Sequence, residues 1–455
     1  MPDAPYHAME SGSFKKRNGG TPPSAATIAA LAAIAFISGS ANGYNGFLLE
    51  GCIPRMFAAG VITTVEQAGL LGGALSFGGL VGSFACAELT YRLSRRHVVV
   101  LGEVVILLGA LTFAGANSFP LVLLGRVLTG SGVGICGLAK PLIVSELAPP
   151  HMRGTLVSLV AVGQSIGLNL LYVADFALPP ASSTWAWRAL VLFGATPAAA
   201  VVVLALATSR SDYWDVAPCS IAPAAGAEEA LVSDTPLEQI RQLCSAGTAW
   251  QTRRNFGLIL AMMVGYNLSG TLVIANYAGD ILASAGAYDR SLPIIIGLVQ
   301  FLGLLSATLF VDRVGRRLLL LGSCVLTAAS LFAMAALLGW MEGTEGGGAA
   351  SSSSWSAPSL LALMVAVEYA VGAGLNPIRI ILSAELMPSR FRPLGMSLGN
   401  TFGWTMALLS LYLYPVLAAH ASGPAPQFAF FGSVVTALTV LLVWQLPETN
   451  GIDFD

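Results

Sequence analysis

The stretch SELAPPHMRGTLVSL, residues 145–159, has a counterpart in SAELMPSRFRPLGMSL, residues 383–398. In both stretches a Glu is followed three positions later by Pro and seven positions later by Arg. Long apolar segments flank both copies, so the repetition indicates that the chain consists of two similar halves. The repeated charged residues are Glu146, Arg153, Glu385 and Arg392.

The composition of the chain points to a lipid environment. Of its 455 residues, 55% are hydrophobic and 10% are charged, and the mean hydropathy is +0.74. Soluble proteins carry about 25% charged residues, so this chain has too little polar surface to cover itself in water. The net charge of −2 supplies no basic excess, and we therefore expect no nucleic-acid partner. The partner that the composition predicts is the lipid bilayer.

Twelve segments are apolar over the roughly 20 residues that a helix needs to cross the hydrocarbon core. A polar region separates them into two sets of six. The predicted fold class is therefore an all-α membrane protein in which twelve transmembrane helices form two six-helix bundles. The first set covers 24–48, 66–90, 97–116, 119–143, 154–177 and 186–208, and the second covers 254–278, 291–311, 318–340, 358–382, 395–418 and 427–446.

The same division predicts the domain organisation. Pro236 and Glu238 suit the first turn of a helix, and they predict one short helix in the polar region between the halves. The predicted parts are an N-terminal tail (1–23), an N-terminal bundle (24–208), a linker (209–253), a C-terminal bundle (254–446) and a C-terminal tail (447–455).

The distribution of Lys and Arg predicts the orientation in the membrane. Sixteen of the 22 basic residues fall in the tails, the linker and the loops on the side of the two termini. Because cytoplasmic loops carry an excess of Lys and Arg, we expect both termini in the cytoplasm. The plasma membrane is favoured over an organelle membrane.

A second phrase is also duplicated at corresponding places in the two halves. YRLSRRHVVV (91–100) follows the second predicted span, and VDRVGRRLLL (311–320) follows the eighth. The glutamates of the first phrase end spans 4 and 10, which are also equivalent positions. Parallel six-helix repeats of this kind are the architecture of major facilitator transporters.

The chain resembles the sugar porter branch of the major facilitator superfamily over nearly its whole length. The motifs that carry the resemblance are GYNG (43–46), GRVLTGSGVGI (125–135), PLIVSELAPPHMRG (141–154), VDRVGRR (311–317), AELMPSRFR (384–392) and PETNG (447–451). The resemblance implies a cytoplasmic charge latch that holds the inner side closed. Its residues here are Arg92, Arg95, Arg96, Glu146, Arg153, Asp312, Arg313, Arg316, Arg317, Glu385 and Arg392.

The two copies of the latch differ. The second copy contains Gly315, whereas the first has Ser94 at that place and Tyr91 in place of the family's Asp. Because Ser replaces a Gly that would tolerate a positive φ, and Tyr replaces the Asp, we expect the second copy to carry more of the latch than the first. Glu88 is a candidate replacement for the missing carboxylate.

The resemblance also implies a substrate site between the two halves, although several family positions are changed. Leu272 and Gly403 stand where the family has Asn, and Ala161 stands where it has Gln, with Gln164 one turn later. At the position that is an Asp in proton-coupled members this chain has Asn45, which cannot titrate, and Arg126 is expected to orient the first span near it. The candidate substrate-binding residues are Gln164, Tyr266, Asn267, Asn276, Tyr277, Gln300, Arg379 and Trp404.

The charged residues inside the predicted spans need separate explanations. Arg379, on a span that Gly and Pro residues are expected to break, either binds an anionic or strongly polar solute or pairs with Glu368. Lys140 is expected to extend to the cytoplasm past Glu146. Glu103 has no partner that the sequence identifies.

The sequence therefore predicts facilitative transport of a small polar organic solute by alternating access, with a sugar or polyol as the leading class. An organic anion transporter that uses Arg379, and a transporter-like sensor without flux, are the alternatives. No phosphate-binding loop, catalytic constellation or metal-ligand spacing occurs in the sequence, so we expect no enzyme activity, cofactor or metal. The oligomeric state and the particular substrate are left open.

Overall fold

A computed structural model of the chain describes residues 25–147, 152–179, 185–207, 241, 250–285, 289, 291–344, 355–387, 392–420 and 423–446. Within these ranges the regular structure is helical and no strand occurs. Both predicted tails and most of the predicted linker, with its short helix, lie outside the described residues.

The first predicted span corresponds to α2. A second helix, α3, follows α2 after a single residue and extends beyond the predicted end of the span. Thr64 caps the start of α4, and its side chain accepts a hydrogen bond from the Gln67 N–H, while Gln67 Oε1 accepts one from the Thr63 N–H at 2.8 Å. The helices are α2 (Ala25–Phe47), α3 (Leu49–Ala58), α4 (Val65–Arg92), α5 (Arg95–Gly115), α6 (Phe119–Leu147), α7 (Arg153–Ala177) and α8 (Ala186–Ala207).

The C-terminal bundle contains two interrupted spans. Gly270, with φ of 79°, separates α10 from α11, and a π-helical turn joins α14 to α15. The tenth span, which was expected to be broken, is thus a continuous helix with one widened turn. Such π-helical turns occur mainly as single turns inside α-helices. The elements are α10 (Trp250–Asn267), α11 (Thr271–Ser284), α12 (Leu292–Val314), α13 (Arg316–Thr344), α14 (Ser356–Ala370), η6 (Val371–Leu375), α15 (Asn376–Glu385), α16 (Arg392–His420) and α17 (Ala425–Gln445).

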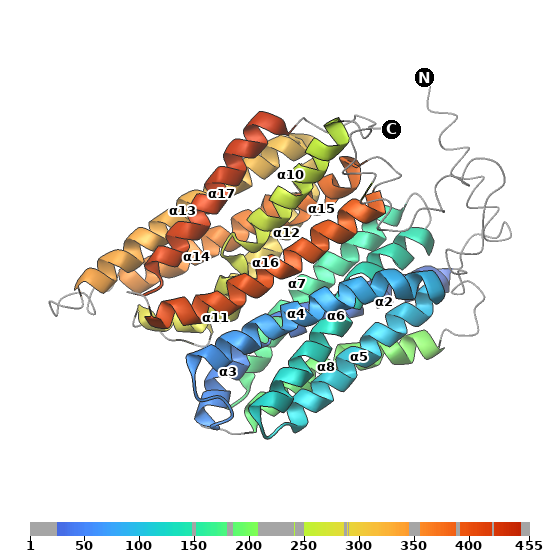
Figure 1. Ribbon diagram of the computed structural model, residues 1–455, viewed down its shortest axis with the longest axis horizontal. Coiled ribbons are helices and arrows are strands. Elements are labelled where there is room, and N and C mark those ends of the chain that lie inside the picture. Colours follow the sequence, from blue (N-terminus) through green and yellow to red (C-terminus); the bar gives the residue numbers. More distant parts are fainter. Residues whose placement is uncertain are drawn as a thin grey trace.

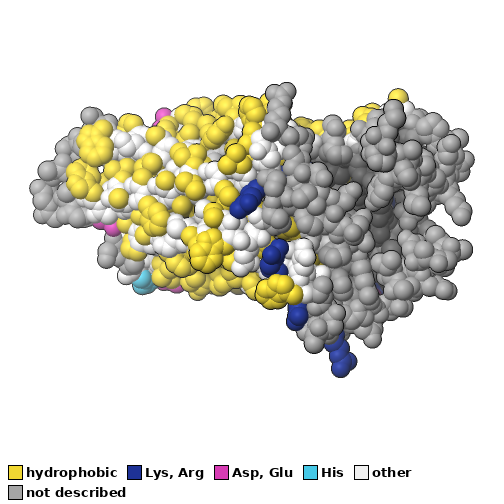
Figure 2. Space-filling view, turned by 90° about the horizontal axis from the view of Figure 1, so that it is seen from above, with side chains coloured by type: hydrophobic (Ala, Val, Ile, Leu, Met, Phe, Trp, Pro, Cys, Tyr) yellow, Lys and Arg dark blue, Asp and Glu magenta, His cyan; other side chains and the backbone are white. Residues whose placement is uncertain are grey.

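The helices have the length and surface of a membrane protein. Eleven helical stretches among the described residues are long and apolar enough to cross a bilayer. The preceding α2 has 23 residues and no charged side chain, so that each of the twelve predicted spans contains a helix. Hydrophobic side chains cover much of the described part of one face, and the Lys and Arg side chains in view lie where this part meets the residues drawn in grey (Figure 2). An apolar face of this kind is suited to contact with lipid acyl chains.

The two bundles meet lengthwise, with α4 beside α16 (Figure 1). Glycines permit the close approach. A Cβ atom on Gly79 would lie 2.7 Å from the Trp404 ring, and one on Gly72 would lie 2.8 Å from the Tyr277 hydroxyl oxygen. Small residues at such positions let helices pack closely in a membrane.

The described contacts between the bundles are concentrated toward one end, which we call the closed end and which includes α3 and α11. Among the described residues, the side-chain hydrogen bond between bundles that lies furthest from it joins Asn400 Nδ2 to Ser83 Oγ at 3.2 Å. The opposite end carries the arginines of the loops after α4 and α12, and we call it the arginine end.

Candidate functional site

Arg379 lies in α15 with its guanidinium over the ring of Tyr266 in α10, at 3.9 Å from the ring centroid. Its Nη2 donates to Asn376 Oδ1 at 3.2 Å, and its Nε is buried without a partner. Among the described residues no carboxylate lies within ion-pair distance of it. The possible pairing of Arg379 with Glu368 is therefore not present, because both side chains are occupied by other groups.

Glu368 is buried in α14 and is held by the two neighbouring helices. Thr271 Oγ1, at the start of α11, donates to its carboxylate from 2.8 Å, and Gln300 Nε2, in α12, donates to its Oε2 from 2.8 Å. The structure thus joins Gln300, a predicted substrate contact, to a carboxylate whose role the sequence did not indicate.

Three further predicted site residues have buried polar atoms at or near the junction of the bundles. Asn276 uses its Nδ2 on the Leu272 carbonyl but has no partner for Oδ1, and Trp404 has no partner for Nε1. The Tyr277 hydroxyl donates to the Leu411 carbonyl at 3.2 Å. Unpaired buried polar atoms are rare, and a bound polar solute would supply their missing hydrogen bonds.

The other two predicted contacts differ in their surroundings. Asn267 donates from Nδ2 to the Met263 carbonyl at 2.8 Å, within its own helix, so this amide N–H is already used. Gln164 is exposed on α7, and its side chain makes no hydrogen bond to another described residue. The structure therefore does not join Gln164 to the group around Arg379.

Arg126 and Asn45 lie together in the N-terminal bundle. Arg126 Nη1 donates to the Asn45 carbonyl oxygen at 2.7 Å. Asn45 Nδ2 donates to the Ala41 carbonyl at 2.8 Å and the Gly194 carbonyl at 3.1 Å. The amide at this position is thus tied to two helices, and no carboxyl group faces Arg126 there.

Lys140 corrects a prediction. Instead of extending toward the arginine end it is fully buried, and its Nζ lies 3.3 Å from Glu103 Oε1. It also donates to the Ser38 carbonyl at 2.8 Å and to Asn42 Oδ1 at 3.0 Å, while the Ser38 hydroxyl donates to Glu103. The carboxylate in α5 and the oxygens of α2 attract the ammonium group inward, since this satisfies both charges without contact with water.

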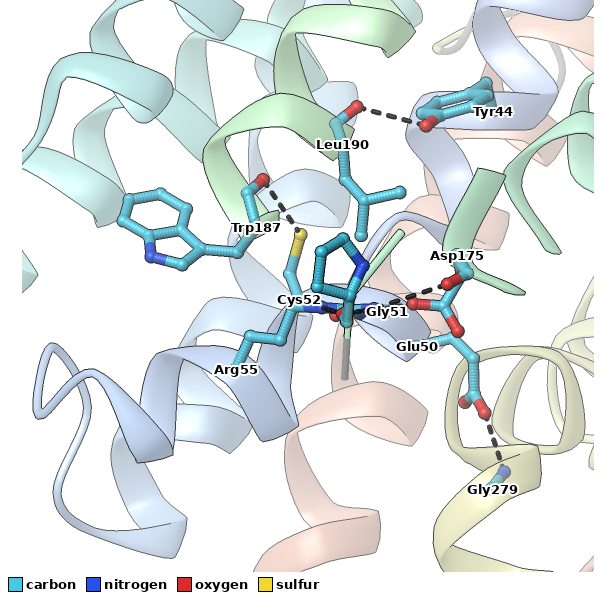
Figure 3. A network of polar contacts seen from close by, with 10 residues as sticks. Tyr44, Glu50, Gly51, Cys52, Arg55, Asp175, Trp187, Leu190 and Gly279 are labelled. Carbon is cyan, nitrogen blue, oxygen red and sulfur yellow. Dashed lines mark hydrogen bonds and ion pairs between the residues drawn. The ribbon is translucent and has the colours of Figure 1, made fainter. Parts of the chain in front are cut away.

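The closed end contains a charged network that the sequence did not reveal (Figure 3). Arg55 in α3 forms an ion pair with Asp175 in α7 and donates to the Pro179 carbonyl at 3.0 Å. This fixes α3 so that Glu50 points toward the other bundle. Glu50 Oε1 accepts the N–H of Gly279 in α11 at 2.6 Å. Burial raises the pKa of the Glu50 carboxyl well above its ordinary value, and neighbouring Asp280 acts in the same direction.

The backbone of α11 is distorted where these contacts occur. Tyr277 has the non-helical angles φ −136° and ψ 24°. A regular helix would join the Gly279 N–H to the Ala275 carbonyl. Here the Gly279 N–H donates to Glu50, and the Ala275 carbonyl accepts from the Tyr172 hydroxyl of α7 at 2.9 Å. Two side chains of the N-terminal bundle thus bind the backbone of α11 on both sides of its kink.

The predicted latch is only partly described. The side chains of Arg95, Glu146, Arg153, Asp312, Arg313, Glu385 and Arg392 lie outside the described residues. Arg92 pairs with Glu88 at 2.6 Å with both side chains mostly exposed. Arg96 donates to the Ala205 carbonyl, and Arg317 donates to the Val443 carbonyl, each within its own bundle.

The two copies of the latch differ in backbone conformation at the position of Gly315. Gly315 has φ of 90°, whereas Ser94 has φ of −64° with extended ψ. The glycine therefore provides a turn that the first copy lacks.

The residues that sequence reasoning missed are Glu50, Asp175, Tyr172 and Thr271. Each of them contacts a residue of another helix that is distant in the sequence, so the contact depends on the fold. Glu50 and Arg55, two charges directly after an apolar span, gave the one signal for the network at the closed end.

Two bundles of membrane-spanning helices that pack side by side define a membrane transporter of the major facilitator fold. The inward open conformation of the xylose transporter XylE from E. coli has this fold, with a TM-score of 0.73 and 18% sequence identity over 94% of this chain and 98% of that chain.

The sequence comparisons give the family. The family model for sugar (and other) transporters matches residues 26–455, and the chain belongs to that family. Polyol transporter 5 of Arabidopsis thaliana is 26% identical over 85% of this chain and 77% of its own length. The facilitated trehalose transporter Tret1 of Apis mellifera ligustica is 25% identical over 85% of this chain and 78% of its own length.

Proposed function

We propose that this protein moves a sugar or polyol across a membrane by facilitative alternating access. The observation that carries the proposal is a set of buried polar atoms at the candidate site that have no hydrogen-bond partner among the described residues, namely Asn276 Oδ1, Trp404 Nε1 and Arg379 Nε. A solute with several hydroxyl groups offers both donors and acceptors to such atoms. The named activities of the polyol and trehalose relatives support the same class of solute.

The proposed orientation follows the basic residues. The arginine end faces the cytoplasm together with both termini, in the plasma membrane, and the closed end faces outward. The chain then consists of the two bundles 24–208 and 254–446 with the linker 209–253 on the cytoplasmic side.

The test is uptake by the purified protein in liposomes. D-xylose, L-arabinose, D-glucose, trehalose and sorbitol are offered as radiolabelled solutes, with an organic acid of similar size for comparison. The proposal requires saturable uptake of at least one neutral solute above that of protein-free liposomes. Uptake of the organic acid alone would mean that the protein is an organic anion carrier instead. Binding of a solute without uptake would mean that it is a sensor.

We expect transport to be uncoupled from protons. Asn45 occupies the place of the coupling carboxylate, and the structure ties its amide to the Ala41 and Gly194 carbonyls, so no proton is taken up or released there. Internal solute should therefore rise only to the external concentration, with or without an imposed proton gradient. Accumulation that a gradient drives and a protonophore abolishes would contradict this expectation.

We expect variants at the two ends to shift the conformational equilibrium in opposite directions. Glu50→Ala removes the acceptor of the Gly279 N–H and weakens the outer closure, so outward-open molecules should become about tenfold more abundant, which corresponds to about 1.4 kcal/mol. Glu385→Gln weakens the proposed latch at the arginine end and should favour the inward-open state. Labelling of single cysteines placed at either end, in a background without native Cys, measures both changes.

Conservative variants separate these effects from general damage. Glu50→Gln keeps an oxygen acceptor for the Gly279 N–H and should shift the equilibrium less than Glu50→Ala. Glu146→Gln should shift it less than Glu385→Gln, because its copy of the latch lacks the family's Asp and the turn that Gly315 provides. Equal and negligible effects of all four variants would mean that these charges only set membrane topology.

A further inference from the structure

The cluster around Glu368 joins three separate helices at one buried carboxylate. Thr271 Oγ1 lies 2.8 Å from both carboxylate oxygens, and Gln300 Nε2 lies 2.8 Å from Oε2. Glu368 itself is 1% exposed. A carboxyl oxygen accepts hydrogen bonds, and a primary amide donates from its nitrogen and accepts at its oxygen. In the structure the nitrogen of the Gln300 amide donates to Glu368 Oε2, so the oxygen end of the amide is the end turned away from Glu368.

Gln300 lies beside the junction of the bundles. One turn earlier in α12, a Cβ atom on Gly297 would lie 2.9 Å from Asn169 Oδ1 and 2.9 Å from the Tyr172 ring, both in α7 of the other bundle. Gln300 is partly exposed, and no described residue donates to its Oε1. The oxygen end of this amide is thus the end that remains available.

We propose that Glu368 is a positioning residue that orients the Gln300 amide so that Oε1 is presented to the substrate as a hydrogen-bond acceptor. The inference rests on the proposed function, and it narrows the substrate class. The substrate group at this point is a hydroxyl that donates a hydrogen bond, and an acceptor-only group is rejected there. Glu368 itself does not touch the solute.

Two variants of Glu368 test the orienting role. Glu368→Leu removes the acceptor, so the Gln300 amide is free to turn and the substrate Kd should rise roughly 2- to 12-fold, the range expected for one uncharged hydrogen bond. Glu368→Gln should restore most of the affinity, because its oxygen can accept from Gln300 Nε2 while its amide N–H donates to Thr271 Oγ1. In a Gln300→Leu background, Glu368→Leu should have no further effect on Kd.

Substituted sugars give a readout that loss of structure would not produce. The probes are the monodeoxy and deoxyfluoro analogues of whichever sugar from the uptake panel binds most tightly. A fluorine accepts but cannot donate, so at the contacted position the unaltered protein should bind both analogues equally weakly. In Glu368→Leu the amide can present its N–H groups, and the deoxyfluoro analogue should bind more tightly than the deoxy analogue.

A measurement without ligand separates this inference from the proposed function. Glu368→Leu and Gln300→Leu should be non-additive in thermal stability, since the two side chains share one hydrogen bond. Additive effects, or an unchanged analogue pattern in Glu368→Leu, would overturn the orienting role while sugar transport stands. Failure of the unaltered protein to bind any solute of the panel would overturn the proposed function, and non-additivity would then still assign Glu368 the task of holding Gln300.

Discussion

We expect Lys140→Met to lower the free energy of unfolding by about 3–5 kcal/mol, the range for removing one partner of a buried ion pair. The substitution keeps much of the side-chain volume but leaves the Glu103 carboxylate buried without a cation, beside the Ser38 hydroxyl and the Cys136 thiol. It also removes the donor that binds the Ser38 carbonyl and Asn42 Oδ1. Helices α2, α5 and α6 should therefore separate more easily. The measurement is the thermal unfolding midpoint in detergent, together with the folded yield.

Two controls make the Lys140 result specific. The double variant Glu103→Gln/Lys140→Met removes both charges, and its stability should recover most of the loss, since no uncompensated buried charge remains. Arg92→Gln breaks an ion pair whose side chains are 72% and 61% exposed, and it should change stability by about 0–1 kcal/mol. A Lys140→Met protein as stable as the unaltered one would show that the two buried charges do not depend on each other.

The helical framework was predictable because it depends on local composition. A helix that crosses the hydrocarbon core needs a long apolar segment, and the spans from α4 onward were located this way within a few residues. The positive φ of Gly315, which Ser94 does not share, also has a local cause, the access of glycine to this conformation. The sequence duplication added the correspondence between the two bundles.

The partners of the buried charges were not predictable, because they depend on which helices meet. Lys140 is close to a predicted cytoplasmic end in sequence, but its partner Glu103 lies in another helix. Arg379 and Glu368 share one span, yet a π-helical turn lies between them and each finds partners elsewhere. A π-helical turn changes the angular relation of residues on its two sides, so a regular helical wheel gives the wrong shared face.

The candidate site was predictable in part. Tyr266 and Arg379 were both named from the sequence, but their stacked contact requires α10 and α15 to lie together. Gln300 was named as a direct substrate contact, and the structure adds the carboxylate that accepts a hydrogen bond from its Nε2. The contact between Glu50 and Gly279 depends on a backbone distortion at Tyr277 that no sequence motif marks. Sequence thus identified polar residues of the site, while their orientation required the fold.

We expect Arg379→Gln to raise the substrate Kd roughly 10- to 150-fold, the range for losing a hydrogen bond to a charged group of about 1.5–3 kcal/mol. Stacking on Tyr266 and the bond to Asn376 hold the guanidinium in place, and Nε has no partner among the described residues. A solute hydroxyl would therefore meet an oriented donor without displacing a carboxylate. Arg379→Lys keeps the charge but loses the planar guanidinium group. Its Kd should therefore lie between that of the unaltered protein and that of Arg379→Gln.

The matched control for this variant is Arg188→Gln. Arg188 also stacks on an aromatic ring, 4.7 Å from the centroid of Trp187, and donates to the Ala114 carbonyl and to Asn117 Oδ1. It lies in the N-terminal bundle away from the candidate site, so its substitution should affect stability without raising Kd. Binding is measured by calorimetry with the neutral solute of the uptake panel and with the organic acid. If Arg379→Gln weakens only the acid, the substrate is an organic anion. If it leaves neutral-solute binding unchanged and behaves like Arg188→Gln, then Arg379 supports the fold rather than the solute.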